Sequence, residues 1–183
     1  MIDYSKFLNN SIQEIKPSGI RKFFDIASEM DDVISLSIGE PDFQTPWHIR
    51  EEGINSLKNG KTWYSPNRGF AQLREEIANY YARRFNISYE GKTQVLVTVG
   101  GSEAIDLAFR CLVSEGDEVI IPEPSFVCYE PLTHMAGGKA VIINTKAEDQ
   151  FRLKADDLEK AITDKTKLVV LPFPNNPTGA IME

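Results

Sequence analysis

Residues 96–109 read Leu-Val-Thr-Val-Gly-Gly-Ser-Glu-Ala-Ile-Asp-Leu-Ala-Phe, and the rest of the sequence is organised around this stretch. An apolar, β-branched run stops at the two glycines, residues 100–101, and an apolar helical pattern follows directly. The pattern predicts a strand over 96–99, a tight turn, and a helix over about 102–113. Free N–H groups at a helix start, together with the helix dipole, favour an anion such as phosphate. A strand-to-helix turn that binds nothing is the plainer alternative.

Downstream of this stretch, apolar runs alternate with helical patterns. The runs lack polar alternation, which is typical of parallel strands covered on both faces. Strands are expected over 118–122, 140–144 and 168–171, and helices from Ser125 and over 153–163. The alternation predicts an α/β layer architecture with right-handed crossovers. Ligands in such sheets bind outside the carboxyl ends of the strands, where three loops lie at residues 100–103, 123–129 and 174–179.

The upstream part is less regular. Apolar spacing and turn residues predict helices over 18–30, 45–58 and 70–85, and a short strand over 33–38. Thr45 is the expected N-cap of the second of these helices, with Pro46 at its first position.

Composition limits the classes of function. The chain has 183 residues and a net charge of −7, which disfavours nucleic acid or an anionic membrane surface as a partner. No apolar run approaches the ~20 residues that span a bilayer. The two cysteines are interpreted as buried thiols in a reducing compartment, and neither histidine has neighbours at metal-ligand spacing. A cytoplasmic protein without a metal site is expected.

Two common phosphate motifs are missing from the sequence. It contains no Gly-x-x-x-x-Gly-Lys-Ser/Thr, so a P-loop nucleotide hydrolase has little support. It contains no Gly-x-Gly-x-x-Gly, so a dinucleotide fingerprint is also missing. A small phosphate-bearing cofactor remains open.

Five short segments, in order along the chain, carry a family resemblance. They are Leu36–Phe43 (LSIGEPDF), Tyr64–Gly69 (YSPNRG), Thr98–Ala104 (TVGGSEA), Pro122–Phe126 (PEPSF) and Asn176–Gly179 (NPTG). With these segments the sequence resembles the N-terminal half of a class I or II aminotransferase that depends on pyridoxal 5′-phosphate (PLP). It is similar to the bacterial branch of aspartate, aromatic and N-acetyl-diaminopimelate aminotransferases.

The resemblance implies a fold and a domain organisation. The fold is expected to be α/β, an incomplete three-layer αβα large domain of the fold type I PLP-dependent transferases. Residues 1–44 are expected to form an N-terminal arm and the start of the small domain. Residues 45–183 are expected to form the N-terminal part of a truncated large PLP-binding domain.

The resemblance also assigns cofactor-binding roles. It implies that Gly101, Ser102 and Glu103 hold the cofactor phosphate through backbone N–H and hydroxyl groups, with the Glu103 carboxylate pointing away. It implies that the Phe126 ring stacks on the pyridine face and that Asn176 hydrogen-bonds the phenolic oxygen. The plainer alternatives are a core position for Phe126 and a turn position for Asn176.

Two more residues match positions outside the phosphate turn. Tyr64 matches a tyrosine that reaches the partner's cofactor phosphate across the interface of a homodimer, its alternative being a surface aromatic beside Trp63. Gly39 matches the glycine that lets the backbone approach the substrate carboxylate, its alternative being an ordinary turn glycine.

The departure from the family concerns the reactive groups. Family members carry a Schiff-base lysine, an aspartate at the pyridinium nitrogen and an arginine for the substrate carboxylate, all downstream of the Asn-Pro-Thr-Gly segment. No lysine from Lys6 to Lys167 stands in the Ser-x-x-Lys context of the family. We therefore expect no catalytic residue in this fragment, and we expect the fragment alone to be inactive.

Four interpretations stay open at this point. The first is a fragment of an aminotransferase that moves an amino group between an amino acid and a 2-oxo acid. The second is a fragment of a PLP-dependent β-lyase of the same fold. The third is a non-catalytic fragment that binds cofactor or associates with a partner, and the fourth is an unrelated phosphate-binding α/β domain.

Overall fold

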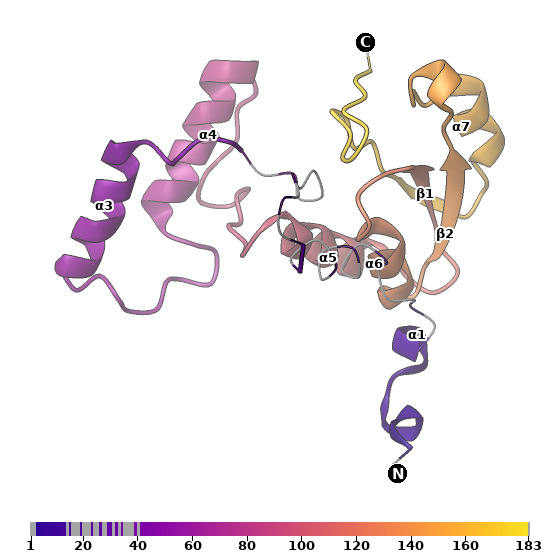
Figure 1. The fold of residues 1–183 in the computed structure, drawn as a ribbon, viewed down its shortest axis with the longest axis horizontal. Coiled ribbons are helices and arrows are strands. Elements are labelled where there is room, and N and C mark those ends of the chain that lie inside the picture. Colours follow the sequence, from indigo (N-terminus) through magenta and orange to yellow (C-terminus); the bar gives the residue numbers. More distant parts are fainter. Residues whose placement is uncertain are drawn as a thin grey trace. The chain divides into compact units, whose positions relative to one another are not determined.

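The computed structural model describes residues 3–13, 15, 19, 23, 26, 29–30, 32, 34, 39 and 41–182. The chain forms two compact units, one of residues 1–17 with 98–183 and the other of residues 18–97 (Figure 1). The helix expected over 18–30 and the strand expected over 33–38 fall largely outside the described residues. Within the described part, no helix is long and apolar enough to cross a membrane.

A parallel sheet is the centre of the unit that contains residues 98–183. Its strands are β1 (Glu118–Glu123), β2 (Lys139–Asn144) and β3 (Thr166–Val169), in the order β2-β1-β3. The central strand β1 pairs in parallel with both neighbours. The three downstream strands expected from the apolar runs are confirmed, and so is their parallel direction.

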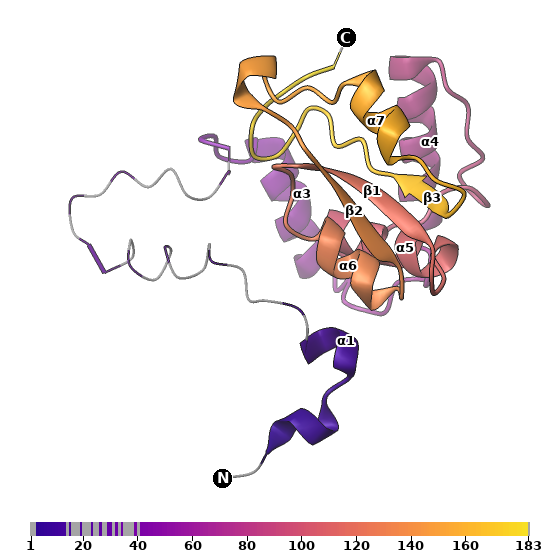
Figure 2. The same cartoon turned by 90° about the vertical axis from the view of Figure 1, so that its right-hand side faces the viewer.

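Helices cover both faces of this sheet. Figure 2 shows α5 (Gly101–Leu112) and α6 (Tyr129–Met135) along one face and α7 (Ala155–Ala161) along the other. Val119 and Ile121 of β1 pack in one buried cluster with Phe109 and Val113, on the face of α5. Ile120 between them points to the opposite face and packs with Ile143 and Leu153. Because the side chains of a strand alternate between its two faces, an unbroken apolar run makes both faces of the sheet apolar. Helices therefore cover the sheet on both sides.

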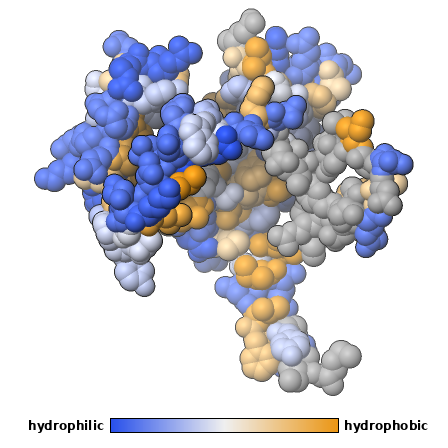
Figure 3. Space-filling model, turned by 60° about the vertical axis from the view of Figure 1, so that its left-hand side comes forward, coloured by the Kyte–Doolittle hydropathy of each residue, from blue (hydrophilic) through white to orange (hydrophobic). Residues whose placement is uncertain are grey.

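Short elements complete this unit. A 3₁₀ turn, η1 (Tyr4–Phe7), and α1 (Asn10–Gln13) belong to its N-terminal segment, where Phe7 keeps 79% of its surface exposed. A second 3₁₀ turn, η2 (Ala147–Asp149), follows β2. Figure 3 shows that hydrophobic residues reach the surface of the face in view.

Residues 96–109 form the expected helix but not the expected strand. Helix α5 begins at Gly101, one residue earlier than expected, after Gly100 with a φ of 93°, a conformation that favours glycine. The strand predicted over 96–99 was wrong. A strand needs a hydrogen-bonded neighbour, and the described residues place none beside it. The Val97 N–H instead donates to the Arg68 carbonyl at 3.2 Å.

Other element boundaries differ by a few residues from the expectation. The helix expected from Ser125 begins at Tyr129, because residues 124–128 form a loop held by other contacts described below. The last strand begins earlier than expected, since the Glu118 N–H already donates to the Lys165 carbonyl at 2.8 Å. Helix α7 is shorter at both ends than residues 153–163.

The unit of residues 18–97 contains two described helices, α3 (Trp47–Lys58) and α4 (Ala71–Phe85). Thr45 does not cap α3: the N-cap is Pro46, and no side chain caps this helix. Arg74 of α4 donates from Nη1 to the carbonyls of Gly91 at 2.9 Å and Lys92 at 2.7 Å. These bonds hold the segment that follows α4 against the helix.

A buried carboxylate braces the amino end of the sheet. Glu118 keeps 8% of its surface exposed and accepts hydrogen bonds from Thr163 Oγ1 at 2.7 Å and Lys139 Nζ at 3.1 Å. These contacts connect β1 to β2 and to the segment before β3. The Thr163 bond, the Lys139 bond and the charges of Lys139 and Lys165 hold the Glu118 pKa below its ordinary value, against the opposing effect of burial.

A first prediction concerns Glu118 and acid stability. A carboxyl whose pKa is lowered by folding stabilises the fold above its unfolded pKa and loses that contribution as pH falls through its folded pKa. The urea midpoint of the wild type should therefore fall between pH 7 and pH 3. Glu118→Gln should lower the midpoint at pH 7 and flatten this decline. Equal declines for the two proteins would contradict the assignment.

A second prediction concerns Gly138, the residue before β2. A Cβ at this position would lie 2.5 Å from Cγ1 of buried Val113 and 3.3 Å from the Asp117 carbonyl oxygen. Gly138→Ala should destabilise the chain by about 1–3 kcal/mol through overpacking, measured by urea denaturation. The matched control is Gly53→Ala in α3, where a Cβ would meet nothing within 4 Å. This control should be neutral or stabilise by ~0.5–1 kcal/mol.

Candidate functional site

The first turn of α5 offers a set of unpaired backbone donors. Gly101, Ser102 and Glu103 are exposed, and within the described residues their N–H groups have no acceptor. The first intrahelical bond runs from the Ala104 N–H to the Gly100 carbonyl at 3.4 Å. A Cβ on Gly101 would meet nothing within 4 Å, so the space in front of this turn is open. Free N–H groups, an exposed hydroxyl and the positive helix end suit a phosphate.

Local hydrogen bonds brace the same turn. The Glu103 carboxylate accepts a hydrogen bond from the Val99 N–H, so it stabilises the helix start. The Thr98 hydroxyl donates to the Gly100 carbonyl at 2.9 Å. Because these side chains satisfy groups that precede the helix, the donors of its first turn remain available.

A second part of the site lies where β1 and β3 end. Adjacent parallel strands open at the same edge of the sheet, so the loops that follow them meet there. These loops line an open cavity of about 330 Å³ on the surface of the unit. Its lining comprises Phe126, Tyr129, Leu171, Pro172, Phe173, Pro174 and Asn176. The structure thus brings together Phe126 and Asn176, which stand 50 residues apart in the sequence.

Tyr129 lines this cavity and a second one beside α5. Its ring contacts the Phe126 ring edge to face, with centroids 5.9 Å apart and an interplanar angle of 84°. It also lines an apolar cavity of about 340 Å³ together with Ala104 and Ile105 from the first turns of α5. Burial, with a smaller contribution from Cys128, raises the pKa of the Tyr129 phenol and favours its neutral form. The sequence reasoning missed this residue, although it follows Phe126 by only three positions.

Asn175 is the second residue that the sequence reasoning missed. It keeps only 7% of its surface exposed, and its Nδ2 donates to the Pro124 carbonyl at 2.8 Å and to Thr178 Oγ1 at 2.9 Å. The neighbouring Asn176 is exposed and faces the cavity. Two adjacent asparagines therefore have different surroundings, and only their local packing distinguishes them.

Two predicted residues belong to the unit of residues 18–97. Tyr64 is fully exposed, at 100% of its surface. Gly39 is exposed, and a Cβ on it would meet nothing within 4 Å. Their roles toward a partner's phosphate and a substrate carboxylate stay predictions, and so does the domain boundary at residues 44–45.

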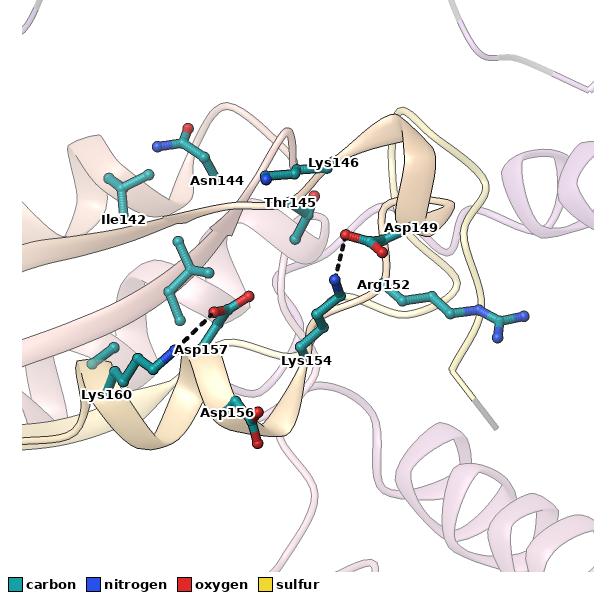
Figure 4. Close-up of a pocket in the computed structure, with 12 residues that line it drawn as sticks. Ile142, Asn144, Thr145, Lys146, Asp149, Arg152, Lys154, Asp156, Asp157 and Lys160 are labelled. Atoms are coloured by element: carbon teal, nitrogen blue, oxygen red, sulfur yellow. Dashed lines mark ion pairs between the residues drawn. The ribbon is translucent and has the colours of Figure 1, made fainter.

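A more voluminous cavity of about 640 Å³ lies elsewhere, between β2 and α7, and none of the predicted residues lines it. Figure 4 shows the ion pairs in its wall: Lys154 Nζ lies 2.7 Å from Asp149 Oδ2, and Lys160 Nζ lies 3.9 Å from Asp157 Oδ1. Carboxylates therefore pair with two of the cations in this wall, whereas the backbone donors of the first α5 turn are unpaired.

Comparisons with known proteins identify the family of this chain. Residues 31–183 match the family described as aminotransferase class I and II. The chain is 50% identical over 177 residues to the Bacillus subtilis protein YugH, covering 97% of this chain and 46% of that protein. It is 43% identical over 175 residues to aromatic-amino-acid aminotransferase 2 of Thermococcus litoralis, covering 96% of this chain and 45% of that enzyme.

A solved structure supports the same family. The aspartate aminotransferase of Thermus thermophilus, solved with maleate, superposes with a TM-score of 0.87 at 36% identity, covering 95% of this chain and 46% of that one. The chain thus spans slightly less than half the length of these relatives. Their names do not favour the β-lyase or the unrelated phosphate-binding domain. In both sequence and fold, the chain belongs to the PLP-dependent class I and II aminotransferases.

Proposed function

We propose that this chain supplies the phosphate-binding and ring-holding side of a PLP site in an aminotransferase that moves an amino group between an amino acid and a 2-oxo acid. One observation carries the proposal. Tyr129 lines the cavity of Phe126 and Asn176 and also a second cavity with Ala104 and Ile105, which directly follow the unpaired N–H groups of α5. An anion site beside an aromatic and an amide matches the three parts of PLP.

The phosphate would be held by backbone donors. The N–H groups of Gly101, Ser102 and Glu103 point out of the helix start, and the Ser102 hydroxyl adds a further donor. Hydrogen bonds to a charged acceptor are about twice as strong as neutral ones. A chain with a net charge of −7 can therefore bind an anion locally without a cationic surface.

The ring would be held in the cavity between the two loops. Phe126 is half-buried, with its edge-to-face contact to Tyr129 limiting its motion, and presents a flat surface for stacking. Asn176, exposed on the same cavity, offers an amide donor to the phenolic oxygen. The bound cofactor supplies the electron sink that makes amino-group transfer possible.

The roles of Tyr64 and Gly39 complete the proposal. A fully exposed tyrosine suits a contact with a second copy of the chain in a homodimer, where its hydroxyl would donate to the partner's cofactor phosphate. A glycine without close neighbours leaves room for a substrate carboxylate near the backbone. Cys111 is exposed and Cys128 half-buried, so the expectation of two buried thiols was wrong, but both thiols are free, which supports a cytoplasmic location.

The covalent and proton-transfer steps need groups other than these. None of the lysines in the 183 residues stands in the Ser-x-x-Lys context of the family. We therefore infer that this chain binds and orients the cofactor but does not transaminate by itself.

A third prediction tests the phosphate turn. Titrating the chain with PLP, followed by absorbance and by displacement with inorganic phosphate, should show saturable binding. Ser102→Ala should weaken it about tenfold, since a hydrogen bond to a charged acceptor is lost. The matched control, Ser88→Ala, changes an exposed serine of the other unit and should bind as the wild type does. Equal weakening by both variants would place the phosphate elsewhere.

A fourth prediction tests the missing linkage. The chain is incubated with PLP, reduced with borohydride and digested, and the peptides are weighed by mass spectrometry. Adducts should be spread at low yield over exposed lysines, because none of them is positioned for the cofactor. A single lysine modified in high yield would show that this chain carries its own linking residue.

A further inference from the structure

Asn175 is a buried polar side chain that connects two loops distant in the sequence. Its Nδ2 reaches the Pro124 carbonyl, 51 residues away, at 2.8 Å. We propose that Asn175 is a positioning residue, which holds the loop of Phe126 against the loop of Asn176 and so sets the width of the cofactor cavity. This inference rests on the proposed function, because the cavity is the one that would take the ring of PLP.

The orientation of the amide follows from chemistry. The Pro124 carbonyl can only accept a hydrogen bond, so the group that faces it is the NH₂ of Asn175. The same NH₂ donates to Thr178 Oγ1 at 2.9 Å. Main-chain bonds anchor the residue on its own loop: its N–H donates to the Ala180 carbonyl at 2.8 Å, and its carbonyl accepts from the Gly179 N–H at 2.7 Å.

The two polar atoms of the Asn175 amide differ in their hydrogen bonding. Oδ1 of Asn175 is buried and has no hydrogen-bond partner. An unsatisfied buried acceptor destabilises a fold. The stabilising contribution of this side chain therefore comes from its NH₂, whose bond to Pro124 is the contact that crosses between the loops.

The two hydrogen-bonded residues, Pro124 and Asn175, each lie close in sequence to a residue that lines the cavity. Pro124 precedes Phe126 by two residues, and Asn175 is followed directly by Asn176. On the Phe126 side, the Tyr129 N–H donates to the Phe126 carbonyl at 3.3 Å, which makes the Tyr129 amide a reporter of that loop. On the other side, the Gly179 amide reports the turn around Asn175.

Amide hydrogen exchange of the chain without cofactor tests the coupling directly. Asn175→Ala and Asn175→Asp both remove the donor, and each should speed exchange at Tyr129 about tenfold. The amides of β1 should stay protected in both variants, which shows that the fold is retained. The matched control Asn144→Asp, an exposed asparagine at the end of β2, should leave Tyr129 unchanged.

A second variant separates this role from a local turn. Thr178→Val removes the other acceptor of Nδ2 but leaves the bond to Pro124, so it should speed exchange at Ala180 and not at Tyr129. If Asn175→Ala changes exchange only within residues 174–180, Asn175 is a turn residue alone, and the proposal is overturned.

The last measurement is the induced circular dichroism of PLP at saturating concentration, which reports how asymmetrically the ring is held. Asn175→Ala should lower this signal several-fold, while Asn144→Asp should keep it. A wild-type signal that persists in Asn175→Ala would overturn the positioning role. A wild type that binds no PLP would refute the proposed function, while the exchange experiment would still decide whether Asn175 couples the loops.

Discussion

The burial of β1 on both of its faces is the constraint on which the structure of the sheet unit depends. Val119, Ile120 and Ile121 have at most 1% of their surface exposed, and they point alternately to the α5–α6 layer and to the α7 layer. A strand in this position cannot lie at an edge or face solvent. Its neighbours β2 and β3 must therefore flank it, and helices must cover it above and below.

The candidate site is a consequence of this arrangement. Because β1 is central and parallel to β3, the loops after both strands leave the sheet at the same edge. Phe126 comes with one loop and Asn176 with the other, and Asn175 connects the two by a hydrogen bond. Tyr129, at the start of α6, extends the contact to the first turns of α5. The site therefore combines residues from three separate stretches of the sequence, 104–105, 126–129 and 175–176.

Electrostatics at the two ends of the sheet differ in kind. At the amino end, the Glu118 carboxylate is paired with Lys139 and hydrogen-bonded to Thr163, which serves stability. At the carboxyl end, the first turn of α5 keeps its N–H groups free, while the Glu103 carboxylate accepts a hydrogen bond from the Val99 N–H, ahead of the helix. The Glu118 charge is thus neutralised at the end of the sheet that it stabilises. The backbone N–H donors of α5 remain unpaired at the end where a ligand would bind.

The sequence by itself determined the α/β class, the three downstream strands, α5 and the family, because apolar periodicity and short motifs are local properties. It also marked Gly101, Ser102, Phe126 and Asn176, whose motifs can be recognised without coordinates. Only the tertiary structure decided that residues 96–99 do not form a strand, since pairing requires a neighbour that the sequence cannot show. Only the tertiary structure revealed Tyr129 and Asn175, because their contacts depend on which strands lie side by side.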